Sequence, residues 1–143
     1  MLNLKKLLTK ISNALYVGNT EYTPTYTSNS YYSETAVNRI RVFRTGPRSG
    51  LVRINLANDL AVIPSSDNSE HEIASFSGIS FARDAYLVLP SQNAGANAST
   101  LYVFCSSNKI RVANFSGVNI AKSTFFRLTV PVVLNLDAGG GNT

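Results

Sequence analysis

The sequence is poor in the residues from which most catalytic and metal centres are built. The 143-residue chain has one cysteine, one histidine, no tryptophan and only 15% charged residues, against about 25% in an average soluble domain. A single cysteine excludes an internal disulfide and any zinc site made of several cysteines. A single histidine excludes multi-histidine metal sites. No apolar run approaches the ~18 residues of a membrane-spanning helix, so we expect no membrane span.

The lone histidine and the lone cysteine stand in sequence contexts that do not favour chemistry. His71 lies between Glu70 and Glu72, with no nucleophile motif such as G-x-S-x-G beside it. Cys105 ends the apolar run 101–104, which predicts a buried, unreactive thiol. The chain also lacks an EF-hand loop and a phosphate-binding glycine loop. We therefore predict no catalytic residue, no cofactor and no metal site, and we do not expect an enzyme.

Small polar residues take the place of the missing charges: 17 Ser, 11 Thr and 15 Asn. With 44% hydrophobic residues the chain can still form the core of one domain. Tyrosine combined with serine and asparagine is typical of adaptable binding surfaces, and the same residues bind sugars. The alternative is that an uncharged polar surface suits a protein assembled from many copies.

The first segment, residues 1–17, has the spacing of an amphipathic, coiled-coil-like helix. Four apolar residues recur with steps of 4, 3 and 4, which is the a/d pattern of a coiled coil: Leu4, Leu8, Ile11 and Leu15. An isolated helix of this length is marginal in water, so it needs a partner, either its own domain or copies of itself. Lysines interrupt the apolar positions, so we expect no secretory signal.

The rest of the chain divides by composition into a connector, a β domain and a tail. Residues 18–37 are rich in Tyr, Ser and Thr and predict an extended connector. Residues 38–136 carry about eight short alternating runs separated by turn signals, which predicts an antiparallel, jelly-roll-like β-sandwich. Another Greek-key topology stays open. Pro131 lies in the last strand and predicts an edge or a bulge there. Residues 137–143 predict a loose tail.

Net charge is +5, and much of it comes from five arginines within 15 residues. They form a possible anionic-ligand strip: Arg39, Arg41, Arg44, Arg48 and Arg53. The alternative is a solvated hairpin face. Nucleic acid is the less favoured ligand because the chain has no recognisable oligonucleotide-binding motif.

This layout resembles small bacteriophage tail or fibre proteins of Gram-positive and gut-bacterial phages and prophages. The heptad-like helix, the polar connector and the β-sandwich carry the resemblance, and residues 78–90 and 109–112 are similar in style to fibre-tip domains. The resemblance implies a homotrimer with three bundled helices and three sandwiches side by side. It also implies other virion proteins and host-surface carbohydrate as partners, and a place in the virion after synthesis in the bacterial cytoplasm.

Three hypotheses follow. The first is a non-catalytic phage virion component of tail-fibre or receptor-binding type, with ligand contacts in loops 91–99 or 64–70 or in clefts between subunits. The second is a stand-alone carbohydrate-binding or cell-surface module, monomeric, with the helix folded onto its own sandwich. The third is a nucleic-acid-associated basic β protein that uses the arginine strip.

Overall fold

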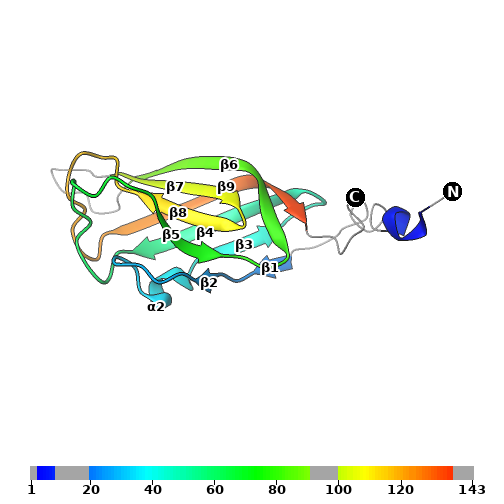
Figure 1. The fold of residues 1–143 in the computed structure, drawn as a ribbon, viewed down its shortest axis with the longest axis horizontal. Coiled ribbons are helices and arrows are strands. Elements are labelled where there is room, and N and C mark those ends of the chain that lie inside the picture. Colours follow the sequence, from blue (N-terminus) through cyan, green and yellow to red (C-terminus); the bar gives the residue numbers. More distant parts are fainter. Residues whose placement is uncertain (1–2, 9–19, 91–99, 137–143) are drawn as a thin grey trace.

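A computed structural model describes residues 3–8, 20–90 and 100–136, with side chains throughout except at 83–90 and 136. Antiparallel strands dominate it (Figure 1). The elements are β1 (Thr20–Tyr22), β2 (Thr25–Tyr26), α2 (Glu34–Val37), β3 (Arg41–Arg44), β4 (Ser49–Ala57), β5 (His71–Ser75), β6 (Ile79–Pro90), β7 (Thr100–Ser107), β8 (Lys109–Ala113) and β9 (Phe125–Leu136).

The strands form one continuous sheet in the order β1-β3-β4-β9-β6-β7-β8-β5-β2. Strand β9 pairs with β4 from Phe125 to Val133 but with β6 only at its last three residues. The sheet therefore curls into a half-barrel, and its two halves enclose the core (Figure 1). The prediction of a mainly antiparallel β protein is confirmed. The pairing does not establish a jelly-roll sandwich.

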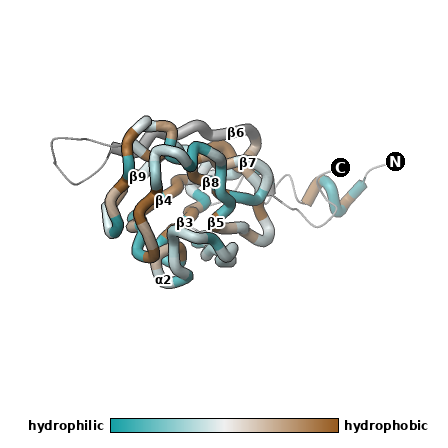
Figure 2. The backbone as a smooth tube through the Cα atoms, turned by 60° about the vertical axis from the view of Figure 1, so that its left-hand side comes forward, coloured by the Kyte–Doolittle hydropathy of each residue, from teal (hydrophilic) through white to brown (hydrophobic). Residues whose placement is uncertain are grey.

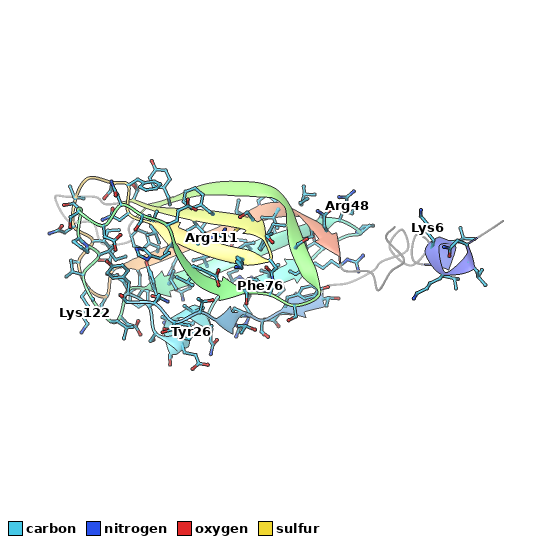
Figure 3. The ribbon with its side chains drawn as sticks, viewed as in Figure 1. Lys6, Tyr26, Arg48, Phe76, Arg111 and Lys122 are labelled. Carbon is cyan, nitrogen blue, oxygen red and sulfur yellow. The ribbon has the colours of Figure 1, made fainter. Side chains whose placement is uncertain are left out.

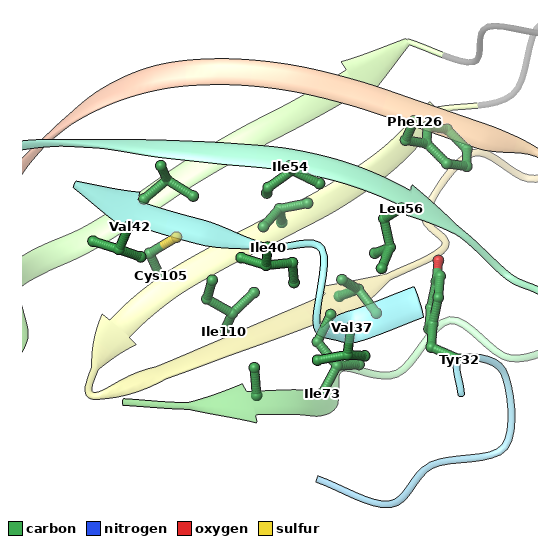
Figure 4. Close-up of a cluster of buried hydrophobic side chains, with 14 of the residues drawn as sticks. Tyr32, Val37, Ile40, Val42, Ile54, Leu56, Ile73, Cys105, Ile110 and Phe126 are labelled. Atoms are coloured by element: carbon green, nitrogen blue, oxygen red, sulfur yellow. The ribbon is translucent and has the colours of Figure 1, made fainter. Parts of the chain in front are cut away.

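Alternation along the strands builds the core from both halves of the sheet. In β4, Val52, Ile54 and Leu56 are buried, while Arg53 between them is exposed. Figure 4 shows Ile54 and Leu56 in one hydrophobic cluster with Ile110 of the opposite half. Full burial of one such aliphatic side chain contributes about 1.5–3 kcal/mol.

Residues 20–37, which we call the strap, link the two edges of the sheet. Strand β1 pairs with β3 and β2 pairs with β5, and only two residues separate β1 from β2. Tyr32 is completely buried, and Tyr22, Tyr26 and Tyr31 pack against the core. Where the sequence predicts an extended connector, the structure thus has two short strands and a helical turn, α2, capped by the Ser33 hydroxyl.

The short apolar run at residues 60–63 contributes only an isolated bridge between Ile63 and Ile120. The expectation about Pro131 has a clearer outcome. Pro131 pairs with Leu51 of β4, while pairing of β9 with β6 begins only at Leu134. At Pro131 the strand is therefore locally an edge, as a residue without an N–H donor requires.

At the N-terminus, residues 4–8 are helical, and Figure 2 shows both hydrophobic and hydrophilic positions among them. The remainder of the helix expected over 1–17, the 91–99 loop and the 137–143 tail lie outside the described residues. Within the described ranges, no helix has the length and apolar character that a membrane-spanning segment requires.

The β body has two distinct ends. At one end, Thr20 pairs with Arg44, and the Leu134 N–H donates to the Arg48 carbonyl at 2.8 Å. The strap therefore starts, and β9 finishes, beside the turn that joins β3 to β4; we call this the hairpin end. The loops 58–70 and 114–124 occupy the other end, the loop end, and Figure 3 shows Arg48 and Lys122 far apart at these two ends.

Two buried asparagines fix the loop end. Asn58 donates to the carbonyls of Ala61 and Ala121 at 2.9 and 3.0 Å and accepts from the Thr124 N–H. Asn114 donates across to Ile63 at 3.2 Å. A second Asn114 hydrogen bond, of 2.8 Å, reaches the carbonyl of Val118. Because buried backbone carbonyls need partners, these amides replace the missing strand pairing between the two loops.

Candidate functional site

The outward side of β3, β4 and β9 carries three arginines and two phenylalanines. Alternation points the odd-numbered residues of these strands away from the core, because their even-numbered neighbours are buried or packed against it. We call this surface the arginine face. Its members are Arg41, Phe43, Ser49, Leu51, Arg53, Asn55, Phe125, Arg127, Thr129, Pro131 and Val133.

Register places the three arginines at neighbouring positions of the sheet. Arg41 is the direct partner of Arg53, and Arg53 in turn is the partner of Thr129, two residues along β9 from Arg127. Arg41 also forms an ion pair of 2.8 Å with Glu21 of β1. Like charges directly opposite each other across two strands destabilise a sheet, so the pairing of Arg41 with Arg53 costs stability.

Each of the two exposed arginines lies over an aromatic ring. The Arg53 guanidinium carbon is 5.1 Å from the centroid of Phe43, and that of Arg127 is 5.9 Å from Phe125. The Nε of Arg127 donates to Asn55 at 3.3 Å. Such stacking orients the planar guanidinium groups and leaves their N–H edges at the surface.

The structure does not bring all five arginines of the sequence-predicted strip together. Arg41 and Arg53 share the arginine face. Arg44 bonds the carbonyls of its own turn, with Nε 3.0 Å from Gly46 O. Arg48 reaches Asn135 at 2.5 Å, at the hairpin end. Arg39 is exposed, and its charge acts on Asp59. Sequence reasoning missed Arg127, which lies 74 residues after Arg53 in the chain but beside it in the sheet.

The chain matches no family model, no curated protein and no solved structure. Functional proposals for this chain therefore rest on the geometry of its own residues.

The proposed oligomerisation residues fall partly within the described chain. Leu4 and Leu8 are 60% and 56% exposed on the short helix, and Leu7 beside them is exposed too. Ile11 and Leu15 lie outside the described residues. The described part of the apolar stripe thus faces solvent in a single chain.

The lone histidine belongs to a polar cluster in the predicted contact loop 64–70. His71 Nε2 lies 2.9 Å from Asp67 Oδ2, and the hydroxyls of Ser69 and Tyr31 donate to the same carboxylate. The Ser69 oxygen is 3.5 Å from that same Nε2. A serine triad needs the carboxylate and the nucleophile on opposite ring nitrogens of the histidine. Here Asp67 and Ser69 both lie at Nε2, so the cluster does not have the geometry of a triad.

Cys105 is buried, as its apolar run predicts, and burial raises the pKa of its thiol to about 12. A thiol that stays protonated at neutral pH is a poor nucleophile and a poor metal ligand. No group of three or more His, Cys, Asp or Glu side chains suited to a metal ion occurs among the residues that the structure describes.

Three carboxylates fasten the strap to the rest of the body. The Thr27 hydroxyl donates to Glu72 at 2.8 Å, Tyr31 donates to Asp67, and the Ser33 N–H donates to Asp59 at 2.9 Å. Each bond joins a strap donor to an acceptor far along the chain. This triple attachment holds the strap across the sheet edges.

All three of these carboxylates have a lowered pKa. The Tyr31 hydrogen bond holds the pKa of Asp67 well below its usual range, helped by His71 and Ser69. Lys109 first, and then Thr27, lower the pKa of Glu72. Burial would raise the pKa of Asp59, but the hydrogen bonds from Ser33 outweigh burial and lower it. The three attachments are therefore in their ionised form at neutral pH.

Proposed function

We propose that this protein is a non-catalytic bacteriophage virion component of tail-fibre or receptor-binding type. It associates as a homotrimer through its N-terminal helix and its β bodies. Its partners are a host-surface glycan or other virion proteins. The two halves of the curled sheet, β1-β3-β4-β9 and β6-β7-β8-β5-β2, would be the two layers of the jelly-roll-like sandwich that the sequence predicts.

The observation that carries this proposal is the exposed leucine stripe on the N-terminal helix. Leu4, Leu7 and Leu8 expose their side chains in a single chain, and the same spacing continues in the sequence to Ile11 and Leu15. A short helix with an uncovered a/d stripe gains stability by packing against copies of itself. This supports helix association between chains over packing of the helix on its own body.

The distribution of exposed apolar residues gives the molecule a polarity that suits a fibre. Apart from the helix and Val133, the large exposed hydrophobic residues of the described chain lie at the loop end: Leu60, Val62, Phe115 and Val118. The helix precedes β1, which starts at the hairpin end. One end would then hold the assembly together, which leaves the outer side of the sheet and the loop end exposed.

The arginine face supports a second candidate, a monomeric carbohydrate-binding or cell-surface module. Such a module also needs an exposed polar and cationic surface, but because it is monomeric it does not require a self-associating helix. The nucleic-acid alternative receives less support, because the five arginines of the predicted strip do not form a single surface.

Substituting the stripe separates these candidates. We expect Leu4→Asp/Leu8→Asp to dissociate a trimer into monomers, because charge at a and d positions cannot be buried in a helix seam. Leu60→Asp, at an exposed leucine of the loop end, is the control and keeps the trimer. A Leu4→Asp/Leu8→Asp variant that stays trimeric would show that the helix does not hold the trimer together. A wild-type monomer would favour the carbohydrate-binding module.

A further inference from the structure

We infer that the arginine face binds a hydroxyl-bearing polymer that carries phosphate or carboxylate groups along its length. The inference rests on the proposed function, since it names the ligand chemistry of the host-surface contact. The binding residues are Arg53 and Arg127, with the polar and apolar side chains between them. This set of arginines differs from the strip that the sequence suggests.

The charge on this face is not compensated. Arg41, Arg53 and Arg127 are neighbours in the sheet, and among the described residues of β1, β3, β4 and β9 the one acid is Glu21, already paired with Arg41. A sheet surface that has no ligand is more stable when charges alternate in sign. Arg41 is occupied by Glu21 and by the Asn38 and Ile40 carbonyls. The guanidinium groups of Arg53 and Arg127, on the neighbouring strands β4 and β9, suit bidentate binding of phosphate or carboxylate.

The aromatic rings of the face argue against nucleic acid as the ligand. Single-stranded nucleic acids bind by stacking their bases on open aromatic faces. Here Phe43 and Phe125 each have an arginine stacked over them, at 5.1 and 5.9 Å. The rings support the guanidinium groups and do not offer a platform for bases. This favours an anionic chain without aromatic groups.

The remainder of the face suits a chain that also carries hydroxyl groups. Thr129, Asn55 and Ser49 contribute hydroxyl and amide groups, and the apolar pair Leu51 and Pro131 lies between Ser49 and Thr129. Towards the hairpin end the face runs into a shallow hollow of about 570 Å³, lined by Arg48, Ser49, Ala82 and Val133.

The hollow supplies a second cationic position along the same strand. From Arg53 to Ser49 the distance along β4 is about 13 Å at 3.3 Å per residue. A linear polymer lying along β4 and β9 would thus meet guanidinium groups at Arg53 and Arg127, then the apolar surface, then Arg48. Anionic groups spaced along a flexible chain fit this arrangement better than a single compact anion does.

The test measures binding of full-length protein to four immobilised polymers: poly(glycerol phosphate), polygalacturonate, neutral dextran and single-stranded DNA. We expect binding to one or both of the first two and none to dextran. Which of the two binds more tightly identifies phosphate or carboxylate as the anionic group. Arg53→Gln/Arg127→Gln should weaken that binding about ten-fold or more, since each arginine contributes charge-assisted hydrogen bonds.

The matched control is Arg111→Gln/Lys122→Gln, which removes the same charge from other parts of the body (Figure 3). It should change the affinity by less than about two-fold at constant salt. Equal weakening in both double variants, tighter binding of DNA than of either polymer, or no binding to either polymer would each overturn the inference. Light scattering of the same samples tests the trimer separately, so failure of binding does not decide the proposed function.

Discussion

Arg41 on β3 and Arg53 on β4 are direct register partners on the outer face of the sheet. We predict that Arg53→Glu leaves the free energy of unfolding within about 0.5 kcal/mol of wild type, because the attraction to Arg41 offsets the lost stacking on Phe43. The same variant should abolish polyanion binding. Urea unfolding monitored by circular dichroism measures the first effect. A loss above ~2 kcal/mol would show that Arg53 serves the fold.

Tyr32 is completely buried in the core beside Leu56 and Phe126 (Figure 4). Within the described structure its hydroxyl is the one buried side-chain polar atom without a hydrogen-bond partner. A buried unsatisfied hydroxyl costs about 1–3 kcal/mol. Tyr32→Phe should therefore raise the free energy of unfolding by about 1 kcal/mol and raise the melting temperature. A clear decrease in calorimetry would mean that the hydroxyl has a partner.

Asn58 links the loops of the loop end through bonds to Ala61, Ala121 and Thr124. We expect Asn58→Ala to lower the free energy of unfolding by about 2–4 kcal/mol, because it leaves several buried backbone groups unpaired. Asn119→Ala removes one exposed bond, to the Ser65 N–H, and should cost under about 1 kcal/mol. Equal costs in denaturant titrations would contradict a special role for Asn58.

Acid should weaken the attachment of the strap. The pKa values of Asp67, Glu72 and Asp59 are lower in the folded chain than their ordinary values of 3.8, 4.5 and 3.8. The unfolded chain therefore takes up protons first as pH falls. The stabilisation is fully present above about pH 5 and is lost progressively below pH 4. Unfolding titrations between pH 2 and 7 measure this loss.

The Asp67→Asn variant checks the pH prediction at one attachment. It should be less stable than wild type at pH 7, because the amide loses the charge-assisted bonds from Tyr31 and Ser69. The difference should shrink as the pH falls towards 2. A difference that stays constant across the whole range would show that the charge of Asp67 does not stabilise the fold.

The sequence predicts the β class because alternation is a local property of each strand. Val52, Ile54 and Leu56 reveal their inward side without any knowledge of their neighbours. The helical turn and the edge strands of the strap escape prediction, since they depend on tertiary contacts. Ser33, for example, caps α2 while its N–H binds Asp59, 26 residues away.

The arginine face shows the same limit. Alternation on β3 alone places Arg41 and Arg44 on opposite faces of the strand. The sequence could therefore have shown that the arginines of the predicted strip do not share one surface. Arg127 joins the face only through the long-range pairing of β4 with β9. No spacing rule within the sequence indicates that contact, because β9 and β4 are not consecutive strands.

The mass of the wild-type protein in solution decides whether the chain is a trimer. Size-exclusion chromatography with light scattering should give three chains of 15.5 kDa, which is 46.5 kDa, at micromolar concentration and neutral pH. A mass of 15.5 kDa that does not rise with concentration would contradict the trimeric fibre.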